Sequence, residues 1–193
     1  MNMASPNEKK KLKEPSLALL QFLESFPDQR KLLANDVKQN RKTLEWHNTA
    51  TNRRNYIRSL FALFEIEESA LRTKAWESIK DLRPRLDENT IERVCLLSNE
   101  EYRIQPNGNV HQMKRRVGFL NSLAYSIKTL KALYNCQQDF LGGQGWQAMQ
   151  NAKEVRDRIT HPRERSVEIE EEDLENFEKA AEWLEWVKES FKN

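Results

Sequence analysis

The chain has 193 residues, of which 32% are charged and 38% hydrophobic, with only five glycines and six prolines. This composition is typical of one globular domain rich in helix. No apolar run approaches the roughly 18 residues of a membrane helix, and the basic N-terminus lacks a signal-peptide cleavage site. Cys95 and Cys136 predict neither a disulfide framework nor a zinc site. We therefore expect a cytoplasmic protein that does not enter a membrane.

The charge of the chain is unevenly distributed. Residues 168–193 hold ten acidic and three basic side chains, a net charge of −7, which leaves +9 on the remainder of a chain whose total is +2. A net charge of only +2 excludes a chain that is strongly basic over its whole surface, as nucleic-acid-binding domains often are. The acidic stretch is either the polar face of a helix or the counterpart of a basic surface elsewhere, which would bind RNA or an acidic partner.

The first 50 residues predict a tail and a helical extension. Residues 1–14 are polar, lysine-rich and without periodicity, which predicts disorder. Within the extension, residues 15–50, a short helix begins at Pro15–Ser16 and closes at Pro27. A second helix then continues over residues 28–50.

Residues 51–193 predict an antiparallel helical bundle, so the fold class is all-α. The first long helix covers residues 52–84 and ends at Pro84. Later helices are expected at about 87–98, 117–135, 145–161 and 170–191, and alternation around Asn107-Gly108 predicts a small hairpin or a polar loop. Apolar residues at helical spacing define the core stripes: Ile57, Leu60, Phe61, Phe64, Leu71 and Ile79; Leu120, Leu123, Ala124, Ile127, Leu130 and Tyr134; Trp146, Met149, Ala152, Val155 and Ile159; Leu174, Phe177, Ala181, Leu184, Val187 and Phe191.

The stretch EVRDRITHPRER, residues 154–165, carries the candidate site. Because Val155 and Ile159 face the core, the polar residues between them lie around the other sides of the helix. Asp157 and His161 share a face, whereas Arg156 and His161 are five residues apart, about 140° around an ideal helix. The two can converge only if the helix end distorts before Pro162 or if a second copy supplies half of the site. A capping histidine and a surface arginine would explain the same spacing.

The motif resembles that of the HEPN superfamily (higher eukaryotes and prokaryotes nucleotide-binding domain). That signature is an arginine, a polar residue and then a histidine near the end of a late helix in an all-α bundle, which Arg156, Asp157 and His161 match. The aromatic helix YIRSLFALFEIEESALR is also similar to a first bundle helix of the family. The resemblance covers about residues 45–190, and residues 1–44 and an insert at about 99–113 lie outside it.

The resemblance implies a metal-independent endoribonuclease of the toxin or antiviral-defence kind, without a cofactor. Catalytic members form homodimers in which the two motif helices face each other, and an antitoxin or another protein is a further candidate partner. His161 would act as base or acid and Arg156 would hold the phosphate, while Asp157 orients His161 or binds the partner's arginine. Arg158, Thr160 and Arg163 are further candidates for contacts to RNA phosphates.

Two alternatives to an enzyme remain open at this point. One is a non-catalytic HEPN-like module that dimerises or binds nucleotide or protein, and the other is a helical scaffold in which the motif arises by chance. Other polar residues are weaker candidates. His47 and His111 are expected at the surface, and Glu67 and Glu68 are interpreted as surface acids in the middle of a helix.

Overall fold

A computed structural model describes residues 17–82, 100–106, 109–114, 117–161 and 168–192. As predicted, these residues form an all-α bundle with one small hairpin. The predicted disordered tail and the predicted helix at about 87–98 lie outside the described residues. The elements are α1 (Leu17–Trp46), α2 (Ala50–Leu82), β1 (Glu100–Ile104), β2 (Val110–Lys114), α4 (Phe119–Leu133), α5 (Gln144–Thr160) and α6 (Glu171–Ser190).

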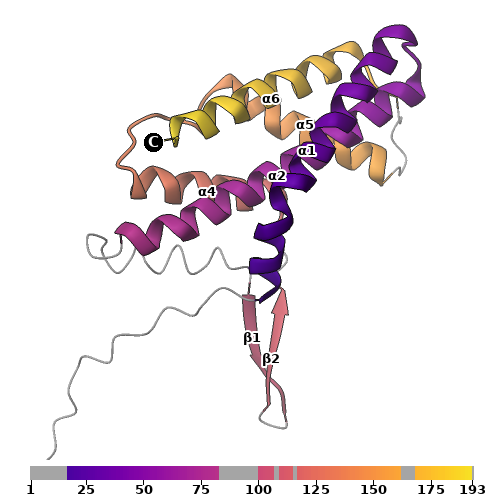
Figure 1. Cartoon of the computed structure of the whole chain (residues 1–193). Coiled ribbons are helices and arrows are strands. Elements are labelled where there is room, and N and C mark those ends of the chain that lie inside the picture. The colour runs from indigo at the N-terminus through magenta and orange to yellow at the C-terminus, as the bar shows by residue number, and fades with distance from the viewer. Residues whose placement is uncertain (1–16, 83–99, 107–108, 115–116, 162–167, 193) are drawn as a thin grey trace, which may run out of the picture.

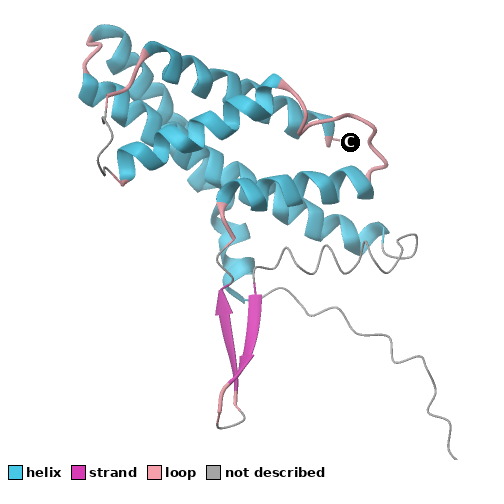
Figure 2. Cartoon of the chain, turned by 180° about the vertical axis from the view of Figure 1, so that it is seen from behind, coloured by secondary structure: helices cyan, strands magenta, loops and turns pink. Residues whose placement is uncertain are grey.

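The long helix α2 is the centre of the arrangement. It contacts α4, α5 and α6, while α1 packs along it from the other side (Figure 1). The hairpin pairs β1 with β2 in antiparallel register, from Glu100 opposite Lys114 to Ile104 opposite Val110, and projects away from the bundle (Figure 2). None of the described helices is long and apolar enough to cross a membrane.

The core forms where the predicted apolar stripes meet. Phe64 of α2 stacks on Phe177 of α6 with 6.0 Å between ring centroids and 12° between ring planes. Each buried side chain of this size stabilises the fold by about 1.5–3 kcal/mol. Most predicted stripe residues are buried: Ile57, Leu60, Phe61, Phe64, Leu71, Leu123, Ile127, Leu130, Met149, Ala152, Val155, Ile159, Leu174, Phe177, Leu184, Val187 and Phe191. The remaining described ones lie partly buried at the edge of the core: Leu120, Tyr134, Trp146 and Ala181, with Ala124.

The prediction that a first helix closes at Pro27 is wrong, because α1 continues through this residue to Trp46. A proline inside a helix removes one hydrogen bond and crowds the preceding turn, which bends the helix more readily than it ends it when tertiary contacts support both sides. α1 changes direction after its first turns and then follows α2 (Figure 1). α1 ends at Trp46, and a short loop leads to α2. Thr49 caps α2, because its hydroxyl accepts a hydrogen bond from the backbone N–H of Asn52 at 3.2 Å.

The interpretation of Glu67 and Glu68 as surface acids is also wrong, because only 5% and 6% of these residues is exposed. Glu67 accepts from Arg30 of α1 at 2.5 Å and pairs with Lys188 of α6 at 3.2 Å. Glu68 accepts a hydrogen bond from Ser122 of α4 at 2.6 Å. The burial is compensated by these partners, so both acids hold helices together.

Candidate functional site

The last two turns of α5 form the candidate site. Val155 and Ile159 are buried and anchor this end of the helix in the core. The helix ends at His161, whose backbone has left the helical region at φ −125° and ψ 68°. Its N–H still donates to the carbonyl oxygen of Asp157 at 2.8 Å. The departure fits the proline that follows, since a residue before proline is pushed out of the α region.

The guanidinium of Arg156 lies between α5 and α2. Its side chain is 33% exposed and contacts Glu65 Oε1 at 3.4 Å and Asp157 Oδ1 at 3.3 Å. It also lies over the ring of Phe61, 5.2 Å from the centroid. A cation at this distance from an aromatic face is attracted to it. Both ion-pair contacts are long and partly solvated, so they position the arginine without burying it.

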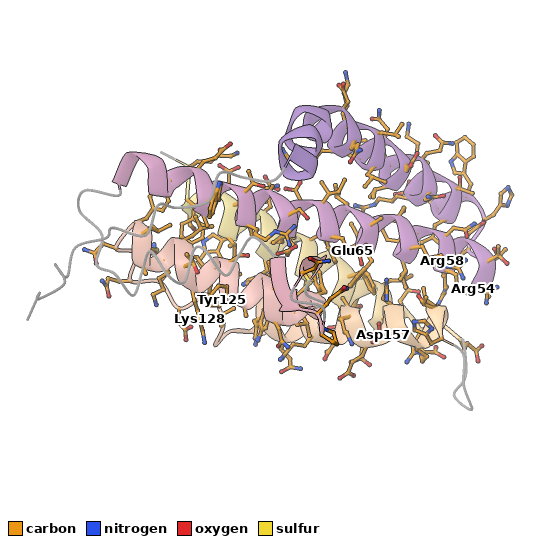
Figure 3. All side chains as sticks on the ribbon, turned by 90° about the horizontal axis from the view of Figure 1, so that it is seen from below. Arg54, Arg58, Glu65, Tyr125, Lys128 and Asp157 are labelled. Atoms are coloured by element: carbon orange, nitrogen blue, oxygen red, sulfur yellow. The ribbon has the colours of Figure 1, made fainter. Side chains whose placement is uncertain are left out.

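The pKa values of the two carboxylates beside Arg156 are shifted in opposite directions. Burial raises the pKa of Glu65, and the charge of Glu68 adds to this effect, although Arg156 opposes it. Burial also acts to raise the pKa of Asp157, but hydrogen bonds and charges from Lys153 and Arg156 outweigh it and leave that pKa lowered. Of the two carboxylates, Glu65 is therefore the one more affected by burial, and Asp157 is the one more strongly paired with cations. Figure 3 shows Glu65 and Asp157 on the same side of the molecule.

His161 is exposed at the end of α5. Among the described residues, Asp157 has Lys153 and Arg156 as its side-chain partners, and its carboxylate makes no hydrogen bond or ion pair with the imidazole of His161. Arg156 and His161 likewise make no hydrogen bond with each other in the described part of one chain. The motif residues lie at the same end of one helix, but the single chain does not join them into one site.

The candidate RNA contacts differ in their placement. Arg158 donates to Asp173 at 2.5 Å and to the carbonyl oxygen of Glu168 at 3.3 Å, so it ties the end of α5 to the start of α6. Thr160 is exposed and its hydroxyl donates to the carbonyl oxygen of Arg156 at 2.7 Å. Arg163 lies outside the described residues. This placement favours a structural role for Arg158 and leaves Thr160 accessible.

Sequence reasoning missed Phe61 and Glu65 as neighbours of the motif. Phe61 was predicted only as core, and it is buried, yet one face of its ring carries Arg156 while Phe119 of α4 packs at 4.9 Å. Glu65 is one helical turn beyond Phe61, on the same face of α2. No local pattern links α2 to a motif about 90 residues away, so only the packing of the helices reveals this contact.

No three His, Cys, Asp or Glu side chains gather into a metal site within the described part of the chain. Comparisons with protein-family models, with curated proteins and with solved structures find no match to this chain. The described residues form an all-α bundle in which Arg156 is one-third exposed and His161 is exposed at the end of α5.

Proposed function

We propose that this protein is a HEPN-like, metal-independent endoribonuclease that acts as a homodimer. The observation that carries the proposal is that Arg156, one-third exposed and oriented by Phe61, shares the end of α5 with an exposed His161. A partly exposed guanidinium and an exposed imidazole are the kinds of group that cleavage of a phosphodiester requires. Resemblance of the motif to the HEPN signature adds the expectation of RNA as substrate and of a toxin or antiviral-defence role, with an antitoxin as a candidate partner.

The proposed reaction is attack of a ribose 2′-hydroxyl on the adjacent phosphate. The oxygen–phosphorus bond to the 2′-oxygen forms, the bond to the leaving 5′-oxygen breaks, and a 2′,3′-cyclic phosphate results. One His161 accepts the 2′-hydroxyl proton and a second group protonates the leaving oxygen. Arg156 stabilises the negative charge on the phosphorane oxygens.

A second copy of the chain completes the proposed site. In one chain Arg156 and His161 make no hydrogen bond with each other among the described residues. A two-fold axis beside the end of α5 brings the Arg156 and His161 of two chains together, so that one imidazole serves as base and the other as acid. Light scattering of the purified protein in solution should therefore give twice the mass of one chain, and a strict monomer would exclude the composite site.

Cleavage of RNA in the presence of EDTA tests the activity. The wild type should cleave, and His161→Ala should lose at least about 100-fold of the rate, the lower range for a general acid or base. His47→Ala is a matched control. His47 is an exposed histidine in the short loop between the end of α1 and the start of α2, outside the motif. Full activity of His161→Ala, or activity that EDTA abolishes, would contradict the proposal.

One observation favours a second candidate function, a non-catalytic HEPN-like module that dimerises or binds nucleotide or protein. Arg156 is already paired with two carboxylates, Glu65 and Asp157. An arginine neutralised in this way is a weaker phosphate ligand than a free one. A dimer that does not cleave RNA in EDTA or with added divalent metal would support the module.

A further inference from the structure

We propose that Arg54 and Arg58 of α2 form a phosphate-binding pair that holds the backbone of single-stranded RNA beside the end of α5. The inference rests on the proposed function, since it names the substrate contacts of the same site. A ribonuclease that cuts within a chain must accommodate the nucleotides that continue beyond the cleaved phosphate. The structure places two unpaired cations where that continuation would lie.

The first support is that both arginines lie on the stripe of α2 that faces the motif. Arg54, Arg58, Phe61 and Glu65 follow one another at spacings of four, three and four, which confines them to an arc of about 60° on a helix of 3.6 residues per turn. Arg156 of α5 lies over Phe61 and contacts Glu65, so this arc faces α5. Figure 3 shows Arg54 and Arg58 on the same side of the bundle as Asp157.

The second support is the position of Arg54 and Arg58 along the axis of α5. Arg156 contacts Phe61, and further along the chain the carbonyl oxygen of Ile169 accepts a hydrogen bond from Arg53 at 2.7 Å. The chain that follows Arg156 therefore runs antiparallel to α2, from the level of Phe61 towards that of Arg53. The stretch from Arg58 back to Arg54 consequently lies alongside the last turn of α5, where Thr160 and His161 are exposed.

The third support is the absence of acidic partners. Arg53, the neighbour of Arg54, is fully engaged by Asn48, Ile169 and Glu171. In contrast, Arg58 is exposed and makes no ion pair or hydrogen bond within the described chain. Arg54 makes only a hydrogen bond to the hydroxyl of Thr51 at 3.3 Å, again with no acid among the described residues.

Two unneutralised guanidinium groups at this spacing suit a polyanion. Residues four apart on a helix have Cβ atoms about 5–6 Å apart, and each guanidinium can hold a phosphate through two parallel hydrogen bonds. Together with Arg156 they form a row of cations along the contact between α2 and α5. A row of this kind matches the repeating charge of a nucleic-acid strand better than the scattered carboxylates of a protein surface.

Fluorescence anisotropy with a short single-stranded RNA, methylated at every 2′-oxygen, tests the pair. Methylation removes the nucleophile, so binding is measured without cleavage. The double variant Arg54→Ala with Arg58→Ala should bind at least about 10-fold more weakly, and the slope of log K against log salt should fall by about 1.4, since each phosphate contact to a single strand contributes about 0.7. Arg54→Lys with Arg58→Lys should keep most of the slope.

The matched control removes two charges of the same spacing elsewhere. Lys38 and Lys42 of α1 are exposed and have no ion pair within the described residues, and α1 lies on the opposite side of α2 from α5 (Figure 3). Their double alanine variant should bind within about two-fold of the wild type with a nearly unchanged slope, because exposed charges beyond a Debye length are screened.

Several outcomes would overturn the inference: a wild type that does not bind this RNA, an arginine variant with an unchanged slope, or a lysine control that loses as much. Competition by poly-glutamate as strong as by RNA at equal charge would also overturn it, in favour of an acidic protein partner. A protein that binds RNA through the pair but never cleaves unmethylated RNA would refute the proposed ribonuclease and leave this inference standing.

Discussion

The two ends of α5 differ sharply in how they are held. At its start, Gly145 lies directly against Trp183 of α6, whose indole N–H donates to the carbonyl oxygen of Phe140 at 3.1 Å, and Trp146 packs on the same indole at 5.6 Å. At its end, Arg156 is held by contacts of 3.3–3.4 Å and His161 is exposed. One end is packed and the other is open.

This difference separates stability from chemistry along a single helix. A close-packed start fixes the position of the helix, since interiors of this density tolerate little change in volume. A loosely paired end leaves polar groups that can exchange their partners for a ligand. Substitutions at the start should therefore change the free energy of unfolding, while substitutions at the end should change activity and leave the fold intact.

The largest effect is expected at Arg156. Arg156→Ala should lower the rate of RNA cleavage by about 100- to 1,000-fold, the range for removing one donor to a developing oxyanion. Arg156→Lys should retain more activity, because it keeps the charge but loses the planar fork. The melting temperature should change little, since the ion pairs of Arg156 are solvated. Wild-type activity in the alanine variant, or loss of activity together with unfolding, would contradict the comparison of the two ends.

The next largest effect is expected at Gly145. A Cβ on Gly145 would lie 2.5 Å from the Cβ of Trp183, a clash that neither backbone nor indole can easily relieve. Gly145→Ala should therefore lower the free energy of unfolding by about 1–3 kcal/mol, the usual cost of overpacking. Urea denaturation followed by tryptophan fluorescence measures it.

Gly143→Ala is the control for Gly145→Ala. It adds the same methyl group two residues earlier, where no atom lies within 4 Å. Its effect should stay within about 0.5 kcal/mol, because the lost preference for glycine at the helix cap and the reduced freedom of the unfolded chain oppose each other. Equal destabilisation by both variants would show that the contact with Trp183 is not tight.

Much of the fold was predictable because the helices are strongly periodic. The stripe of α2 around Phe61 and Phe64 and the end of α5 at His161 both follow from local patterns. Pro27 was misjudged because its local preference competes with the packing of α1 on α2. Glu68 was misjudged although it lies four residues after Phe64 and three before Leu71, spacing that already indicated burial.

The candidate site was predictable only in part. Arg156, Asp157 and His161 are recognised from a motif, but their contacts are not. Asp157 pairs with Lys153 one turn earlier, which the sequence allows equally well as a contact with His161. The contact of Arg156 with Phe61 and Glu65 depends on how α2 and α5 cross, which no local pattern specifies.

A smaller effect is expected at Arg158, the structural arginine at the open end. Its ion pair with Asp173 is partly buried, with 30% and 15% of the two side chains exposed. Arg158→Ala should lower the free energy of unfolding by about 1 kcal/mol, between the values for surface and buried charged hydrogen bonds. The salt dependence of RNA binding should not change. A reduced salt slope would instead show that Arg158 contacts phosphate.

The smallest changes in the free energy of unfolding are expected when either carboxylate beside Arg156 is replaced by its amide. The two changes should depend on pH in opposite directions. The pKa of Asp157 is lowered in the folded protein, since Lys153 and Arg156 outweigh the effect of burial. Asp157 therefore contributes stability above its unfolded pKa and loses that contribution as the pH falls through its folded pKa. Asp157→Asn should cost about 0.5 kcal/mol at pH 7, as for other solvated pairs, and the cost should shrink towards pH 3.

The same measurement on Glu65→Gln should give the opposite trend with pH. Burial raises the pKa of Glu65, so its carboxyl favours folding below its unfolded pKa, and this contribution is lost as the pH rises through the folded pKa. Relative to the wild type, Glu65→Gln should thus become more stable as the pH rises from 4 to 7, whereas Asp157→Asn becomes less stable. Urea titrations at several pH values give both differences. Parallel trends would show that the two carboxylates do not differ in burial and pairing, and Arg156 would then have no preferred partner at the open end of α5.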